Sequence, residues 1–198
     1  MPVSKLQELY EAFDDAATFS RETLNIRNQA GESVPLRLSP AQIKLDALIQ
    51  SIQKKGKPVR IIALKARRVY VSTGVAQQFF HHVAFDKGQR GMIVAHQLRS
   101  CENVFSYYEQ FEESYRPFRG VIDKLKGTIG RSKGNNRIDY AGGGSFRVLT
   151  ANNVEGGRSD SIRYLHLSEY AFMKRARQLM AGLLQAVPMD PDTTDTPA

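Results

Sequence analysis

Residues 65–73 read Lys-Ala-Arg-Arg-Val-Tyr-Val-Ser-Thr, and this stretch decides the predicted fold. An apolar run at residues 61–64, within a predicted strand at 60–64, precedes it, and a segment with helical apolar spacing follows it from Ser72 to about Phe85. A strand, a basic loop and a helix that begins with hydroxyl residues form the layout of a phosphate-binding loop. In such a loop, backbone N–H groups and the helix dipole hold a polyphosphate. The usual glycines are absent, and so is a lysine next to the hydroxyl residue.

A second segment, residues 164–169, reads Tyr-Leu-His-Leu-Ser-Glu and predicts a buried strand that ends in a carboxylate. Glu169 is then placed to act as general base for an attacking water. The alternative is that Glu169 is a helix-starting carboxylate that the helix dipole favours. Together, the basic loop and this strand indicate a nucleotide hydrolase.

The remaining pattern alternates strands with helices. This alternation predicts an α/β fold with a mostly parallel sheet and helices on both faces, in which ligands bind beyond the carboxyl ends of the strands. Both candidate segments fall at such ends. We expect helices at residues 4–17, at 40–52 after the N-cap pair Ser39-Pro40, at 100–115 and at 172–187, and strands at 92–95, near 138, at 145–150 and at 162–167.

The loop chemistry can be assigned from the residue types. Ser72 or Thr73 is placed to bind Mg²⁺, Lys65 could reach the phosphates from the strand end, and Arg67 could act as an arginine finger supplied by the same chain. The alternative is that Lys65, Arg67 and Arg68 form a solvated basic turn. Upstream, Gln42 could read an adenine edge with its amide, or it could simply be a surface glutamine of its helix.

Composition limits the class of protein. The 198 residues are 41% hydrophobic and carry a net charge of +8, which suits a polyanionic partner such as nucleic acid. Cys101 is the only cysteine, so neither a disulfide framework nor a cysteine metal site is expected. The chain shows no signal peptide and no membrane-spanning window, which predicts a cytoplasmic protein without a membrane partner.

The order of four motifs resembles the ATPase part of phage terminase large subunits, the motors that package DNA into proheads. These motifs are Ser-Pro-Ala-Gln at 39–42, the loop at 65–73, Met-Ile-Val-Ala-His at 92–96, and residues 157–172 with the Leu-His-Leu-Ser-Glu strand. The resemblance implies a P-loop NTPase fold that binds ATP and Mg²⁺. It further implies that the loop residues Lys65, Ala66, Arg68, Val71, Ser72 and Thr73 bind the nucleotide, that Arg67 contacts phosphates, that Ser72 holds the metal, that Glu169 activates water and that Gln42 contacts adenine.

The same resemblance implies double-stranded DNA, the phage portal and the small terminase subunit as partners, in the host cell cytoplasm, with a ring oligomer only when the motor is complete. It covers residues 35–188. We therefore expect an N-terminal helix and loop at 1–34, a partial ATPase domain at 35–188 that is incomplete at its C-terminal side, and a disordered acidic tail at 189–198, without a nuclease domain.

Tyr70 departs from the pattern of the terminase branch that this chain resembles, which has glycine at that position of the loop. Glycine allows a positive φ and a close backbone approach to phosphate, both of which a bulky side chain disfavours. This departure keeps a second function open, namely a catalytically degenerate remnant of a prophage terminase that binds DNA or protein.

Overall fold

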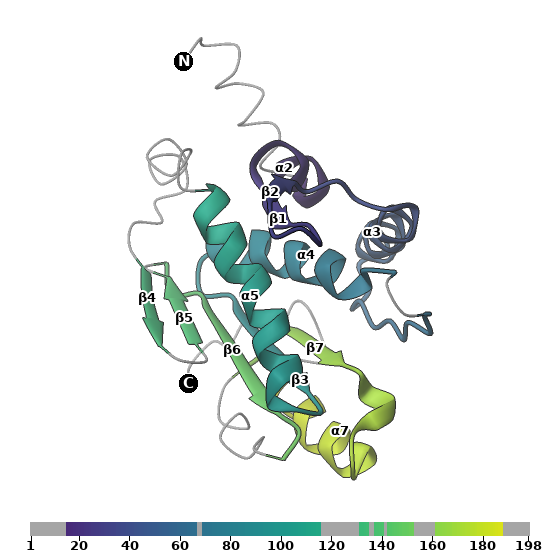
Figure 1. Ribbon diagram of the computed structural model, residues 1–198. Helices are drawn as coiled ribbons and strands as arrows, with labels where there is room; N and C mark the ends of the chain where they lie inside the picture. Colours follow the sequence, from purple (N-terminus) through teal and green to yellow (C-terminus); the bar gives the residue numbers. More distant parts are fainter. Residues whose placement is uncertain are drawn as a thin grey trace.

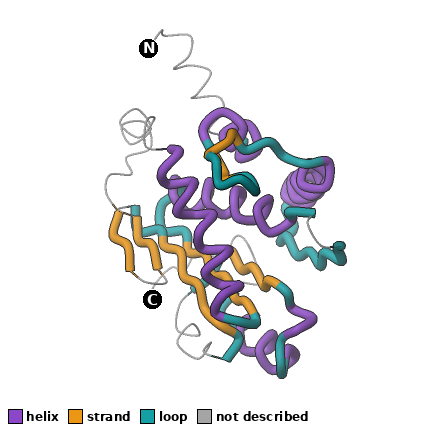
Figure 2. Tube along the Cα trace, viewed as in Figure 1, coloured by secondary structure: helices purple, strands orange, loops and turns teal. Residues whose placement is uncertain are grey.

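The structure is a computed structural model that describes residues 15–66, 69–115, 131–134, 137–140, 142–152 and 161–187. A five-stranded sheet carries helices on both faces (Figures 1 and 2), and a separate two-stranded hairpin lies near the N-terminal helix. In chain order the elements are α2 (Ala16–Thr23), β1 (Asn25–Arg27), β2 (Ser33–Pro35), α3 (Pro40–Gln53), α4 (Val71–Phe85), β3 (Arg90–Ala95), α5 (Leu98–Tyr115), β4 (Arg131–Gly134), β5 (Arg137–Tyr140), β6 (Ser145–Thr150), β7 (Tyr164–Ser168), the 3₁₀ helix η3 (Tyr170–Phe172) and α7 (Ala176–Leu184).

The strand order is β4-β5-β6-β3-β7. The strand β3 pairs in parallel with both β6 and β7, whereas β5 pairs in antiparallel fashion with both β4 and β6. A parallel central strand is covered on both faces, and residues 91–95 of β3 are accordingly all buried. The predicted α/β class, with parallel strands at the centre of the sheet and helices around it, is confirmed.

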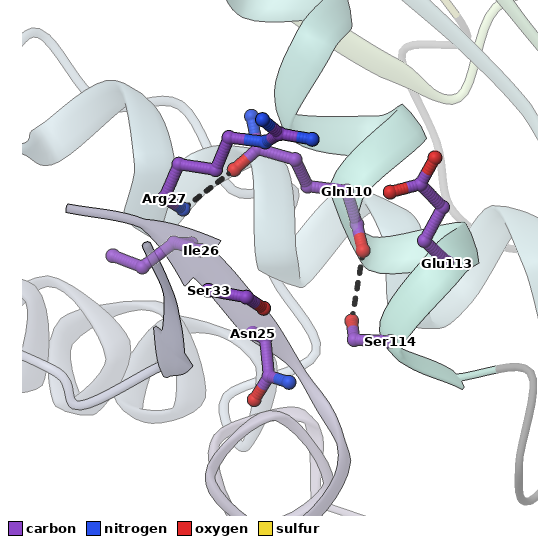
Figure 3. Close-up of a pocket in the computed structure, with 7 residues that line it drawn as sticks. All are labelled: Asn25, Ile26, Arg27, Ser33, Gln110, Glu113 and Ser114. Atoms are coloured by element: carbon purple, nitrogen blue, oxygen red, sulfur yellow. Dashed lines mark hydrogen bonds between the residues drawn. The ribbon is translucent and has the colours of Figure 1, made fainter. Parts of the chain in front are cut away.

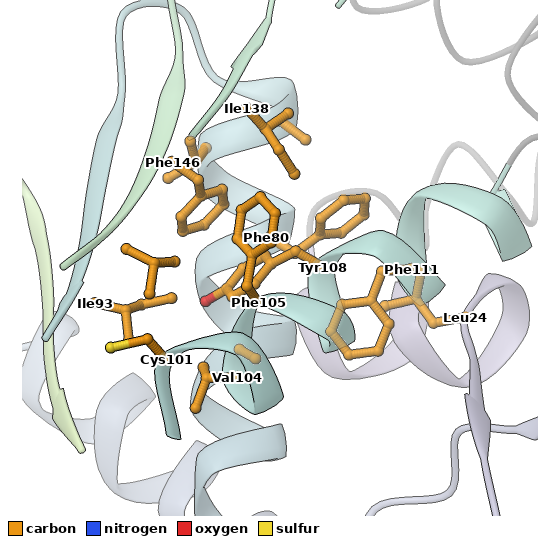
Figure 4. Close-up of a cluster of buried hydrophobic side chains, with 14 of the residues drawn as sticks. Leu24, Phe80, Ile93, Cys101, Val104, Phe105, Tyr108, Phe111, Ile138 and Phe146 are labelled. Carbon is orange, nitrogen blue, oxygen red and sulfur yellow. The ribbon is translucent and has the colours of Figure 1, made fainter. Parts of the chain in front are cut away.

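Each face of the sheet has its own apolar cluster. Ile93 points to the face that α4 and α5 cover, where Phe80, Tyr108 and Phe111 form the centre of the larger cluster (Figure 4). Successive residues of a strand point to opposite faces, so Met92 contributes to the second cluster, together with side chains of α7. The prediction of helices on both faces is therefore confirmed.

The N-terminal part differs from the sequence expectation. A loop was expected after the N-terminal helix within residues 1–34, but the chain there forms the β1–β2 hairpin, in which Ile26 pairs with Val34. The helix α2 begins after Asp15, whose carboxylate accepts a hydrogen bond from the Thr18 amide at 2.8 Å. Most of the predicted helix at 4–17 lies outside the described residues.

The helix α3 starts as predicted, at Pro40 after an N-cap at Ser39. The side chains that hydrogen-bond α3 to the rest of the domain recur every four residues, at Gln42, Asp46 and Gln50. Asp46 accepts a hydrogen bond from the Gln78 amide of α4, and Gln50 donates to the Asp15 carboxylate at 3.2 Å. Gln42 is the buried residue of this helix. Side-chain hydrogen bonds thus attach α3 to the domain, and no side chain of this helix belongs to either apolar cluster.

Two predicted elements are wrong in part. Residues 60–64 form no strand and lie in coil, with the side chains of Ile62 and Leu64 fully exposed. The helix predicted at 172–187 is instead the short η3 followed by α7, because Arg175 adopts a left-handed backbone conformation (φ 57°) just before α7. No helix of the described part is long and apolar enough to cross a membrane.

Candidate functional site

The start of α4 has an unusual backbone. Tyr70, the residue just before the helix, has φ 54° and ψ 24°, which is the left-handed region. This conformation is uncommon for a residue other than glycine, asparagine or aspartate. It falls at the position where the terminase-like pattern has glycine. A tyrosine thus occupies a position whose left-handed backbone conformation is one that glycine adopts most easily.

The carbonyl group of Tyr70 accepts three hydrogen bonds. The amides of Thr73 and Gly74 donate to it at 3.1 and 3.2 Å, and the side-chain Nε2 of Gln42 donates at 2.8 Å. The other end of the Gln42 amide, Oε1, accepts from the Ser39 amide at 2.7 Å, which closes the capping box of α3. Gln42 therefore joins the start of α3 to the start of α4. To read an adenine edge it would first have to release these partners.

Glu169 lies directly after β7, at the carboxyl end of the parallel strands. It too is left-handed (φ 58°), and its carbonyl accepts from the Phe172 amide at 3.0 Å. Its carboxylate oxygen Oε2 lies 2.8 Å from Nδ1 of His96 and accepts from the Ser100 hydroxyl at 3.0 Å. His96 follows β3 and Ser100 lies in the first turn of α5, so three adjacent elements converge on this carboxylate.

This cluster is not a serine-hydrolase triad. In a triad the histidine lies between the serine and the carboxylate, whereas here Ser100 and His96 both contact the same oxygen of Glu169. The arrangement instead orients a carboxylate whose side chain is 45% exposed to solvent. An oriented, solvent-accessible carboxylate can accept a proton from water.

The helix α4 and the strand β7 are packed together. The ring of Phe79 lies 5.3 Å from that of Tyr164, and the ring of His82 stacks on the same tyrosine at 5.3 Å. Burial raises the pKa of Tyr164 to about 12. Burial, and secondly the positive charge of Lys65, lower the pKa of His166 to about 4. Lys65 thus lies within electrostatic range of the strand that ends in Glu169.

No protein-family model matches this chain, and no curated protein matches it. Among solved structures, the large terminase ATPase domain of Thermus phage P74-26 is similar to it. The likeness covers 77% of this chain and 68% of that chain, with 15% sequence identity and a TM-score of 0.49.

The structure brings together some of the predicted site residues. Gln42 contacts Tyr70 within the loop, and Ser72 and Thr73 lie in the first turn of α4, half-buried and buried respectively. Lys65 and Ala66 are exposed, and Val71 is half-buried as the first residue of α4. Arg67 and Arg68 lie outside the described residues. Among the described contacts, no hydrogen bond or ion pair joins Glu169 to Lys65 or Ser72.

Sequence reasoning missed two residues of the cluster. Neither His96 nor Ser100 is among the site residues predicted from the sequence, where residue 100 only marks the start of the predicted helix at 100–115. In the structure α5 already begins at Leu98, which frees the Ser100 hydroxyl for Glu169. A usable signal was present, because His96 and Glu169 each follow a predicted buried strand directly, and neighbouring parallel strands end at the same edge of a sheet.

A metal-ligating cluster or a cavity elsewhere in the domain could also form a binding site. Within the described ranges, no group of three or more His, Cys, Asp or Glu side chains could hold a metal ion. A pocket of about 240 Å³ lies between the β1–β2 hairpin and α5 (Figure 3), away from Tyr70 and Glu169, and it is smaller than a typical ligand cavity. It is lined by Asn25, Ile26, Arg27, Ser33, Gln110, Glu113 and Ser114.

Proposed function

We propose that this chain is an ATPase module of the phage terminase type, which couples ATP hydrolysis to translocation of viral DNA into a prohead. The observation that carries the proposal is the left-handed backbone of Tyr70. It gives the loop a glycine-like turn at the position where the motif calls for one. The helix that follows is packed on the strand that ends in Glu169.

In this proposal the residues of the loop bind the nucleotide. Lys65 and Arg67 neutralise the phosphates, and Ala66, Arg68, Val71 and Thr73 line them. Ser72 holds Mg²⁺. A single hydroxyl fits this ion, because Mg²⁺ usually keeps several waters and takes its remaining ligands from the phosphates. Bound Mg²⁺ would neutralise charge on the transferred phosphoryl group.

Glu169 is the general base in this proposal. Both of its side-chain contacts, with His96 and Ser100, use Oε2. Within the described part of the chain, no hydrogen bond or ion pair involves Oε1, and this oxygen would accept a proton from the attacking water. The partners of the working motor would be double-stranded DNA, the portal and a small terminase subunit.

A second function is favoured by two observations. The Tyr70 side chain is bulky and stands at the phosphate loop, and residues 60–64, which should lead into that loop from the sheet, are coil. Both would weaken nucleotide binding. Under this alternative the chain is a degenerate prophage remnant that binds DNA or protein without hydrolysis.

Isothermal titration calorimetry with Mg-ATP separates the two functions. We expect the native chain to bind Mg-ATP, and we expect Glu169→Gln to keep binding but to lower the hydrolysis rate by about 10²–10⁴-fold. Glu102→Gln, which removes an exposed carboxylate of α5, is the matched control and should leave the rate unchanged.

Tyr70→Gly tests the loop itself. Binding by Tyr70→Gly alone would support the degenerate remnant, because it would show that the tyrosine spoils an otherwise competent loop. Binding by neither the native chain nor Tyr70→Gly would refute the assignment of a nucleotide site in this chain.

A further inference from the structure

The helix α3 leaves its aliphatic side chains outside both apolar clusters. Four of them share the i, i+3, i+4, i+7 spacing that normally marks the buried face of a helix, and they are here called the aliphatic stripe: Leu45, Leu48, Ile49 and Ile52. None of the four is buried, and none belongs to a cluster or packs against one. Leu48 is 46% exposed.

The side of α3 that attaches to the domain is polar instead. Gln42, Asp46 and Gln50 form the hydrogen bonds that join this helix to its neighbours. In Figure 1, α3 lies at the margin of the domain, beside α4 and away from the sheet. The aliphatic stripe is therefore an apolar helix face without an apolar partner in the described part of the chain, and such a face marks an interaction surface.

The chain that precedes Asp15 lies outside the described residues, and it ends at this helix. The Asp15 carboxylate oxygen Oδ1 accepts a hydrogen bond from Nε2 of Gln50 at 3.2 Å, and Gln50 lies in the last turn of α3. A segment attached at this point needs no linker to reach the aliphatic stripe, so its effective concentration there is high.

The sequence of that segment matches the surface. Four apolar residues repeat the helical spacing of the aliphatic stripe, namely Leu6, Leu9, Tyr10 and Phe13. Residues 4–14 also contain three acidic residues and one lysine, which gives a net charge of −2. Four exposed lysines lie on α3 or just after it, namely Lys44, Lys54, Lys55 and Lys57. Opposite charges thus favour the contact.

We propose that residues 4–13 form an amphipathic helix that docks its apolar side chains on the aliphatic stripe of α3. The segment ends beside Gln50, so it can cover Leu45 only by running parallel to α3, with Phe13 near Ile52 and Leu6 near Leu45. Ten helical residues span about 15 Å, which is enough to cover the stripe. This inference does not depend on the proposed function, because it uses neither nucleotide binding nor Glu169.

Two other occupants fit the aliphatic stripe less well. A second copy of the chain carries a net charge of +8, and the lysines beside the two stripes would repel one another. The apolar residues 61–64 follow α3 closely in the sequence. However, Ile62 and Leu64 are 98% and 103% exposed, so their side chains do not cover α3.

Hydrogen exchange of the full chain, followed by NMR, tests the proposal. We expect the amides of Leu9 and Tyr10 to exchange at least tenfold more slowly than in an unstructured chain. Leu48→Asp should remove this protection, and so should Leu9→Asp, because each places a charge in the same apolar contact. The double variant should exchange no faster than either single variant. Unchanged exchange of the β3 amides shows that each variant keeps its fold.

Matched variants and cross-links make the result specific. Ala47→Asp adds the same charge at an exposed position of α3 outside the aliphatic stripe, and Gln7→Asp does so within the segment. Both should keep the protection. The pair Phe13→Cys/Ile52→Cys should form a disulfide on mild oxidation, whereas Leu6→Cys/Ile52→Cys should not. The reverse result would refute the parallel direction.

Three results would overturn the proposal as a whole. One is unprotected exchange of Leu9 and Tyr10 in the native chain. Another is protection that Leu48→Asp leaves intact, which would mean that the segment docks elsewhere. The third is protection of α3 that appears only in a dimer detected by sedimentation, which would identify a second copy as the occupant.

Discussion

The side-chain amide of Gln42 donates a hydrogen bond to the backbone carbonyl of Tyr70, and the two atoms, Nε2 and O, lie 2.8 Å apart. This bond ties the first turn of α3 to the residue whose positive φ starts α4. The predicted role of Gln42 in binding adenine and its observed role in the fold compete for the same amide group.

We expect Gln42→Glu to lower the free energy of unfolding by about 1–3 kcal/mol. The carboxylate can still accept from the Ser39 amide, but it cannot donate to the Tyr70 carbonyl, so the substitution isolates the bond between the helices. Urea denaturation followed by circular dichroism measures the change. Gln29→Glu, in the exposed turn of the β1–β2 hairpin, is the control and should cost less than about 0.5 kcal/mol. Equal losses at both positions would contradict the structural role of Gln42.

Gly74 provides a second test of the same contact. A Cβ atom on Gly74 would lie 2.9 Å from Cγ of Gln42, which is too close. We therefore expect Gly74→Ala to destabilise the native chain although alanine is the better helix former. In a Gln42→Ala background the clash with Cγ is absent, and the same change should stabilise the protein by up to about 1 kcal/mol. A double-mutant cycle in thermal unfolding measures this reversal, and strictly additive effects would refute it.

The backbone at Tyr70 should discriminate strongly between side chains. In the left-handed region glycine carries no Cβ penalty, whereas β-branched valine carries a large one. We expect Tyr70→Gly to be more stable than Tyr70→Val by about 1–2 kcal/mol in urea denaturation. The same pair of substitutions at Ala63, an exposed coil residue, is the control and should differ by less than about 0.5 kcal/mol.

His166 should make the protein sensitive to acid. Its pKa is lowered to about 4 from an ordinary value of 6.5, so the folded state resists a proton that the unfolded state accepts. Stability from this residue is complete above pH 6.5 and falls as the pH drops toward 4, by about 2 kcal/mol at pH 4.5. Unfolding experiments at pH 7 and pH 4.5 measure the loss, and His166→Gln should remove that part of it.

Lys65 offers an independent check of this electrostatic contact. Lys65→Gln removes the second cause of the shift, so the pKa of His166 should rise toward its ordinary value, as followed by NMR titration of the ring. An unchanged titration would mean that Lys65 lies farther from β7 than the structure places it.

Local signals predicted those elements whose bounds are set by local chemistry. Ser39-Pro40 predicted the start of α3 because a side-chain cap and a fixed φ act within one turn. The alternation in residues 145–150 predicted β6 with its observed bounds. Residues 60–64 also favour a strand by their composition, yet they are coil in the structure. A strand needs a neighbouring strand to pair with, and the residues of one segment do not specify that neighbour.

In the candidate site, too, the features set by local sequence were predicted and those set by neighbouring elements were not. Glu169 was predicted at a strand end and is found there, directly after β7. The convergence of His96 and Ser100 on its carboxylate could not be predicted in the same way, because it depends on β3 and β7 being neighbours. The roles assigned to Lys65, Ser72 and Gln42 in nucleotide binding stay predictions, as do the domain limits at residues 34 and 188.

The polar attachment of α3 has a consequence for how the protein opens. No side chain of α3 belongs to either apolar cluster, so its detachment exposes less apolar surface than global unfolding does. This opening should therefore have a smaller heat-capacity change and a weaker dependence on denaturant. Native-state hydrogen exchange in low urea should therefore place the amides of α3 in a separate, early-opening unit, while those of β3 exchange only with global unfolding. Tyr70 in the phosphate loop would then lose its hydrogen bond from Gln42 under conditions in which the sheet is still folded.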